Sequence, residues 1–140
     1  MKKRFQRSIC YNNLLFIILI VFTAVPGLAF SKPPSIELVT NGKSLYTIVI
    51  PAAPSAQEKR ASEVFQKYVE KMSGCRLPIA SQMPATGKGI FIKEVDGLKF
   101  DGYRISTQPG GAIHIKGGKS KGCIYGAITI LDKYLGCRLY

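Results

Sequence analysis

The sequence predicts a two-layer α+β domain, a small mixed sheet of about five to six strands with two helices on one face. Three observations support this prediction. Several short runs rich in β-branched residues are separated by glycine and proline. Two longer segments carry apolar residues at helical spacing. The second of these segments follows two alternating runs whose connection is typical of a hairpin.

The first 29 residues have the order of a secretory signal. Four basic residues precede an unbroken apolar stretch, Leu14 to Val25 with a single threonine, and small residues lead to a cleavage site after Ala29. The apolar stretch is shorter than the roughly 20 residues of a membrane span. We therefore expect a cleaved signal peptide over 1–29, a linker over 30–35, and secretion or export to the periplasm or cell envelope. An uncleaved membrane anchor is the alternative.

Basic residues outnumber acidic ones in the mature part. The signal removes four of the 20 basic residues and leaves 16 against 8 acidic ones. They do not form the basic stripe with interleaved aromatic residues that is typical of a nucleic-acid-binding protein. The sequence therefore argues against nucleic acid as a partner and favours a solvated basic face. Attraction to acidic polysaccharides or to an anionic envelope surface is the alternative.

The domain, expected over 36–140, begins with two short strands. The run 36–40 predicts the first strand, and Asn41-Gly42 predicts a turn. Residues 46–50 are apolar and β-branched, which predicts a strand buried on both faces. The prolines within 51–54 end it.

The first helix begins at a capping box, in which Ser55 and Glu58 satisfy backbone N–H groups. Charged residues occupy one side, and Gly74 is suited to the left-handed conformation that ends helices. The apolar face is expected to comprise Ala61, Val64, Phe65, Tyr68, Val69 and Met72. This pattern makes the segment an amphipathic helix that covers the sheet.

Shorter elements follow the first helix. We expect strands at 76–80, 89–93, 103–107 and 112–116, the last two joined as a hairpin across Pro109-Gly110-Gly111. Alternation in the last strand places its isoleucines on the core side and its histidine on the opposite side.

The last helix, expected from Ser120 to Leu135 and closed by Gly136, is apolar on nearly all sides. Its inner stripe is predicted to be Ile124, Ala127, Ile128, Leu131 and Leu135. A domain of about 110 residues cannot readily cover such a helix alone, so another domain is expected to pack on it. The candidate interface residues are Gly122, Tyr125, Gly126, Ile130 and Tyr134. For the two glycines, close packing on the domain's own sheet is an equal alternative.

Three cysteines follow the signal. Cys123 and Cys137 lie near opposite ends of the last helix, about 20 Å apart at about 1.5 Å per residue, which is too far for a disulfide. Each helix ends in Gly-Cys-Arg-Leu, and parallel helices would bring Cys75 close to Cys137. A disulfide between Cys75 and Cys137 is one expectation, and three buried free thiols are the equal alternative.

Gly117-Gly118-Lys119-Ser120 before a helix is reminiscent of a phosphate-binding loop. Ile113, however, stands where that motif needs its first glycine. A plain strand-to-helix turn is therefore favoured over an anion site.

No residue is assigned to catalysis, to a metal or to a cofactor. His114 is the sole histidine and lacks partners at metal-ligand spacing. The close carboxylates Glu94, Asp96 and Asp101 lie around one turn, not across a cleft as glycoside hydrolysis requires. The chain alone is expected to be inactive.

Two segments carry a resemblance to a known family. Ser73-Gly74-Cys75-Arg76-Leu77-Pro78-Ile79 is similar to its "TG-x-x-LP-I" segment. The last 20 residues are similar to its "RG-x-x-YG … LG-x-R-x-Y/W" pattern, with Lys121 where the pattern has arginine. The chain thereby resembles the N-terminal domain that precedes the catalytic barrel in α-glucuronidases, β-N-acetylhexosaminidases and related secreted proteins.

The resemblance implies a small sheet with two helices on one face, packed against a (β/α)8 barrel that holds the acid–base carboxylates. We therefore expect a non-catalytic N-terminal domain of an exported glycoside-hydrolase-like protein, truncated before its barrel. The alternative is a stand-alone exported module that binds a polysaccharide or a surface.

Overall fold

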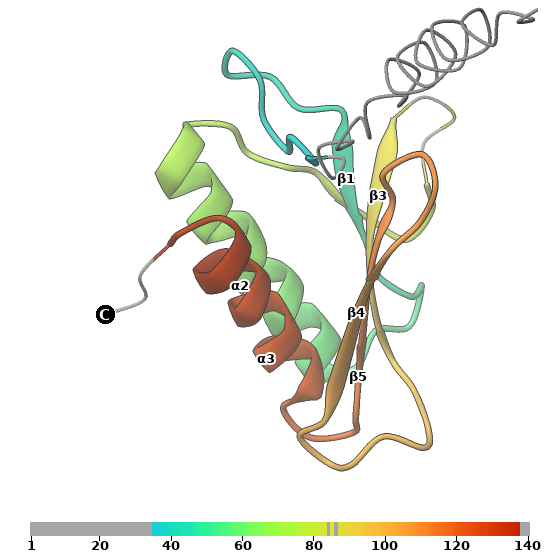
Figure 1. Cartoon of the computed structure of the whole chain (residues 1–140). Helices are drawn as coiled ribbons and strands as arrows, with labels where there is room; N and C mark the ends of the chain where they lie inside the picture. Colours follow the sequence, from blue (N-terminus) through green and yellow to red (C-terminus); the bar gives the residue numbers. More distant parts are fainter. Residues whose placement is uncertain (1–34, 84, 86, 138–140) are drawn as a thin grey trace, which may run out of the picture. The chain divides into compact units, whose positions relative to one another are not determined.

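A computed structural model describes residues 35–83, 85 and 87–137, which belong to one compact unit that begins at Ser35. A five-stranded mixed sheet is covered by two helices on one face, which confirms the predicted α+β fold (Figure 1). The expected signal peptide over 1–29, and the linker up to residue 34, lie outside the described residues. Within the described part, no helix has the length and apolar character needed to cross a bilayer.

The sheet has the order β2-β1-β3-β5-β4, and all neighbours are parallel except β4 and β5. The strands are β1 (Tyr46–Val49), β2 (Ile79–Ala80), β3 (Lys88–Glu94), β4 (Tyr103–Thr107) and β5 (Ile113–Gly117). The antiparallel pair is the expected hairpin, whose turn contains Gly110 and Gly111 at positive φ. Burial of every β1 residue agrees with the predicted strand buried on both faces.

The predicted strand at 36–40 is wrong. Only Thr40 forms a bridge, and its partner is Lys43 across the Asn41-Gly42 turn. Both turn residues have positive φ, as expected for a tight turn of this kind. Leu38 is nonetheless buried in the core, so the segment contributes apolar packing without ladder hydrogen bonds.

Helix α2 (Ala56–Ser73) confirms the expected first helix. The Ser55 side chain accepts a hydrogen bond from the Glu58 backbone N–H, the Glu58 side chain accepts one from the Ser55 N–H, and Gly74 ends the helix at φ 69°. Ala61, Phe65 and Val69 are fully buried, whereas Met72 is exposed. The predicted apolar face is therefore one residue too long at its end.

Helix α3 (Gly122–Thr129) departs from the expected straight helix over 120–135. It widens at its end into a π-helical turn, η1 (Ile130–Tyr134), in which the Leu135 N–H bonds to the carbonyl of Ile130. The buried residues of the two segments are Gly122, Cys123, Gly126, Ala127, Ile130 and Leu131. Ile124 and Ile128, predicted to face inward, are only half-buried.

One core lies between the helices and the sheet. Strand residues alternate into it, so that Ile48, Ile90 and Ile115 are completely buried. Each such side chain stabilises the fold by roughly 1.5–3 kcal/mol relative to an exposed one. Phe65 from α2 and Leu131 from η1 complete the core from the helix side.

Candidate functional site

The carboxyl ends of the parallel strands are where open α/β sheets commonly bind ligands. In this domain a closed hydrogen-bond network occupies that region. The buried Glu58 carboxylate accepts hydrogen bonds from the N–H groups of Ser55 (2.8 Å) and Glu94 (2.7 Å). The Ser55 hydroxyl in turn donates to the Glu94 carboxylate at 2.7 Å. The network therefore attaches the start of α2 to the end of β3. The polar groups of Ser55, Glu58 and Glu94 that form it are hydrogen-bonded to one another.

Cys123 lies beside this network at the start of α3. Burial of its thiol, reinforced by the negative charges of Glu58 and Glu94, raises its pKa to about 11. The thiol is therefore protonated at neutral pH and unsuited to act as a nucleophile.

The other two cysteines of the described part, Cys75 and Cys137, are half-buried against the same core cluster. They are free thiols in this structure, as is Cys123. The disulfide between Cys75 and Cys137 is thus not formed here, and their pairing under oxidising conditions stays a prediction.

The 117–120 turn has the close packing of a plain turn. The backbone N–H groups of Gly118 and Ser120 donate to the carbonyl oxygens of Gly102 (2.8 Å) and Phe100 (3.0 Å). The Lys121 N–H donates to the Asp101 carboxylate at 3.1 Å. These donors, which a phosphate-binding loop would point at its ligand, are already used by the protein.

The candidate carboxylates are separated by their partners. Glu94 faces α2, Asp101 holds the start of α3, and Asp96 forms an exposed ion pair with Lys119 at 2.9 Å. The hydrogen bond from Lys119, together with its charge, lowers the pKa of the Asp96 carboxyl. Glu94 therefore has a structural contact that the sequence did not suggest. Across the described ranges, no group of three His, Cys, Asp or Glu side chains could hold a metal ion.

A groove of about 710 Å³ runs along the helix layer, and every residue that lines its walls comes from α2, α3 or the segment after α2. Its apolar wall combines Val64 and Tyr68 with Ile124 and Ile128. Charged residues border it: Arg60, Glu63, Lys67, Glu70 and Arg76. The incorrectly predicted inner residues Ile124 and Ile128 thus line a surface feature.

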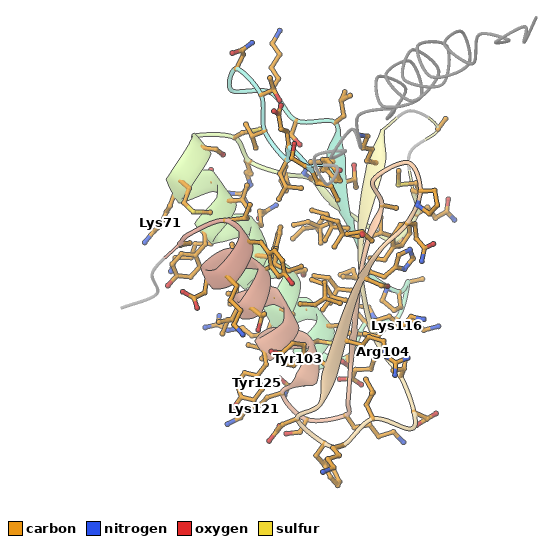
Figure 2. All side chains as sticks on the ribbon, in the orientation of Figure 1. Lys71, Tyr103, Arg104, Lys116, Lys121 and Tyr125 are labelled. Atoms are coloured by element: carbon orange, nitrogen blue, oxygen red, sulfur yellow. The ribbon has the colours of Figure 1, made fainter. Side chains whose placement is uncertain are left out.

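The candidate interface residues divide into two groups. A Cβ atom on Gly122 would overlap the carbonyl oxygen of Gly102, and one on Gly126 would meet Ile115. Both glycines and Ile130 are buried within the domain, which favours the internal-packing alternative for the glycines; a role of these three residues at an interface stays a prediction. Tyr125, which Figure 2 labels, is 39% exposed, and Tyr134 is 72% exposed, so both remain available to a partner.

The sheet face opposite the helices carries a basic row, Lys93, Lys116 and Arg104. Strand register places these residues side by side on β3, β5 and β4, and all three are exposed. Figure 2 shows Arg104 and Lys116 on the side of the sheet away from the helices. The preceding row on that face contains Phe91 and His114, whose rings stack with centroids 4.7 Å apart. Sequence reasoning placed His114 on this face but missed the row, because only the strand register aligns its members.

Comparison with known families identifies the domain. Residues 36–133 match the model described as glycosyl hydrolase family 20, domain 2. The chain belongs to this family. Domain 2 of glycosyl hydrolase family 20 is a non-catalytic accessory domain of glycoside hydrolases. The expected resemblance to a glycoside hydrolase accessory domain is therefore confirmed at this level.

Part of a solved glycoside hydrolase has a fold similar to that of this family 20 domain 2. It is a GH138 enzyme described as targeting pectin rhamnogalacturonan II, with a TM-score of 0.53 and 17% sequence identity. The match covers 68% of this chain and 11% of that enzyme. At this identity the likeness concerns the fold alone. No curated protein matches the chain.

Proposed function

We propose that this chain is the non-catalytic N-terminal domain of an exported glycoside-hydrolase-like protein. Its helix layer would support a catalytic barrel that lies outside these 140 residues, since such a barrel typically takes about 250 residues. The family match over 36–133 is the observation that carries the proposal. Export is inferred from the signal-like residues 1–29.

The surface of the helix layer supports this role. Its groove offers an apolar wall bordered by charged side chains of both signs. Tyr125 and Tyr134 are large exposed side chains on the same helical segment, and tyrosine is enriched at protein–protein interfaces. A barrel seated here would bury the half-exposed side chains that the domain itself leaves uncovered.

The finer assignment, an α-glucuronidase type of accessory domain, is part of the same proposal. Its support is the pattern around 73–79 and the final helix with its Gly-Cys-Arg-Leu end. The sugar and the linkage would then be determined by the barrel.

Reading the genomic frame past the Tyr140 codon tests the proposal most directly. A continuous frame that encodes a (β/α)8 barrel supports it, whereas a stop codon at that point favours a stand-alone module. Export is tested by fusing residues 1–35 to a periplasmic reporter enzyme without its own leader. Reporter activity confined to the cytoplasm would contradict export.

The interface is tested in the barrel-containing protein by replacing Tyr125 and Tyr134 together with serine. We expect the two domains to unfold in separate calorimetric transitions, because buried tyrosines at an interface commonly contribute more than about 1 kcal/mol each. Phe100→Ser is the matched control, since Phe100 is 75% exposed and lies outside the helix layer. Equal effects of the double variant and the control would exclude this surface as the interface.

A further inference from the structure

The open face of the sheet, opposite α2 and α3, combines an aromatic surface with concentrated positive charge. Phe91 and His114 lie on neighbouring parallel strands, and their rings are nearly parallel, at 11°, and stack with centroids 4.7 Å apart. Gly89 makes this possible, because a Cβ atom there would overlap the Phe91 ring. Phe91 therefore leans along its own strand and forms, with His114, a stacked aromatic pair on this face.

The basic row lies two residues further along the same strands. Neighbouring strands are about 4.8 Å apart, so Lys93, Lys116 and Arg104 present three like charges at close spacing. Like charges directly opposite one another destabilise a sheet. Such an arrangement costs stability unless a negatively charged group offsets it.

The described part of the domain provides no such group. Its ion pairs are Arg76 with Glu70 and Lys119 with Asp96, and neither includes a member of the basic row. Asp96, the acid in the loop that borders the row, is thus occupied by Lys119. Glu94 follows Lys93 but is bonded to Ser55 of the helix side. The positive charge of the row remains open to a ligand.

Two hollows on this face meet at Lys116. One, of about 340 Å³, is lined by apolar and aromatic residues that include Ile50, Phe91 and His114, together with Lys93 and Lys116. The other, of about 270 Å³, lies between the 95–98 loop, Arg104 and Lys116. A ligand that extends over both would place apolar surface on the aromatic rings and negative charge on the basic row.

We propose that the open face binds a carboxylate-bearing polysaccharide. Sugar rings present C–H faces that pack on aromatic surfaces, and uronic acids add carboxylates that lysine and arginine bind through charge-assisted hydrogen bonds. The choice of a polysaccharide over another polyanion rests on the proposed function. The site is separate from the helix-layer groove, so the domain could hold its barrel and a polysaccharide at the same time.

The test is calorimetric titration of the full chain with sodium polygalacturonate at low ionic strength, with a neutral galactan in parallel. We expect binding of the polygalacturonate alone. Lys116→Ala and Arg104→Ala should each weaken it about tenfold, as the loss of one charge-assisted hydrogen bond predicts. Lys59→Ala is the matched control, because it removes the same charge from an exposed position on α2.

Three outcomes would overturn the proposal: no binding of polygalacturonate, equal weakening by Lys59→Ala, or equally tight binding of single-stranded DNA or anionic lipid vesicles. Circular dichroism melting of each variant separates lost binding from lost folding. Since this chain alone is used, the result is independent of whether a barrel follows. A stop codon after Tyr140 would thus contradict the proposed support of a barrel and leave the binding measurement intact.

Discussion

Helices α2 and α3 cover the same face of one sheet, yet their starts are held by different means. The start of α2 is fixed by side chains, since Ser55 and Glu58 cap it and bond to Glu94. The N-cap residue of α3, Lys121, provides no side-chain cap. The start of this helix is held by backbone hydrogen bonds to the 99–102 loop and by the Asp101 carboxylate, which accepts a hydrogen bond from the Lys121 N–H. Helix α2 therefore depends on particular polar side chains, whereas the start of α3 also requires glycines, which let its backbone approach the neighbouring loop closely.

The largest loss of folding stability is expected from a substitution at the start of α3. Gly118→Ala places a Cβ atom against the carbonyl oxygen of Lys99, which belongs to the backbone and cannot turn aside. Overpacking usually costs about 1–3 kcal/mol, and this rigid neighbour puts the expected loss at about 3 kcal/mol or more. Urea unfolding measures it.

Gly126→Ala is the matched control for that variant. Its new methyl group would meet the γ2 methyl of Ile115, a side-chain atom and not a backbone carbonyl, and alanine favours a helix over glycine by about 1 kcal/mol. We expect a clearly smaller loss of stability. If Gly118→Ala and Gly126→Ala cost the same, the α3 start is not held by close backbone contact.

The next effect is expected at Glu58. Glu58→Ala removes the acceptor for the Ser55 and Glu94 N–H groups. Hydrogen bonds to a charged group contribute about 1.5–3 kcal/mol, so we expect the free energy of unfolding to fall by about 2–3 kcal/mol. Glu63→Ala, at an exposed position of the same helix, should change it by less than about 0.5 kcal/mol. Comparable losses would show that α2 does not depend on its cap.

Substitution of the serine before each helix further distinguishes side-chain capping of α2 from the backbone contacts that hold α3. Ser55→Ala should cost about 1–2 kcal/mol, the usual value for a lost helix cap. Ser120→Ala should be near neutral, because α3 has no side-chain cap and the backbone N–H of Ser120 makes its contact with Phe100. Chemical denaturation of both variants tests the contrast. A loss at Ser120 as large as that at Ser55 would contradict it.

The smallest expected change in the free energy of unfolding occurs at alkaline pH and is due to the Cys123 thiol. Its thiol ionises near pH 9 when unfolded but near pH 11 in the folded domain. Ionisation therefore stabilises the unfolded state alone as pH rises from 9 towards 11, and folding stability decreases in that window. At pH 10 the thiol should account for a decrease of about 1 kcal/mol relative to pH 7. Cys123→Ala, compared with wild type at both pH values, should lack this contribution; an unchanged slope would contradict the assigned cause.

Sequence patterns revealed those parts of the fold that depend on neighbours along the chain. The capping box at Ser55 and Glu58, the glycine at 74 and the alternating isoleucines of β5 were all evident, because each acts within a few residues.

Features that depend on strand order were not predictable. The basic row joins residues 93, 104 and 116 from three strands, and the register that aligns them is a property of the folded sheet. The predicted inner stripe of α3 failed at Ile124 and Ile128, which line the groove of the helix layer, because helical spacing alone does not tell which apolar residues face the sheet. Gly122 and Gly126 are buried by this domain's own loop and sheet, which helical spacing could not show. Tyr125 and Tyr134 are the exposed interface candidates.

The lengths of the outermost strands limit how this domain can associate. On one side the sheet ends with β2, which has only two residues, and on the other with β4, which has five, including the cationic Arg104. Proteins avoid edge-to-edge aggregation by short or charged edge strands of this sort. A second chain that tried to extend the sheet would find few free main-chain groups on one side and a positive charge on the other. We therefore expect the domain to resist amyloid-like stacking in a crowded compartment and to meet its partners through its two broad surfaces.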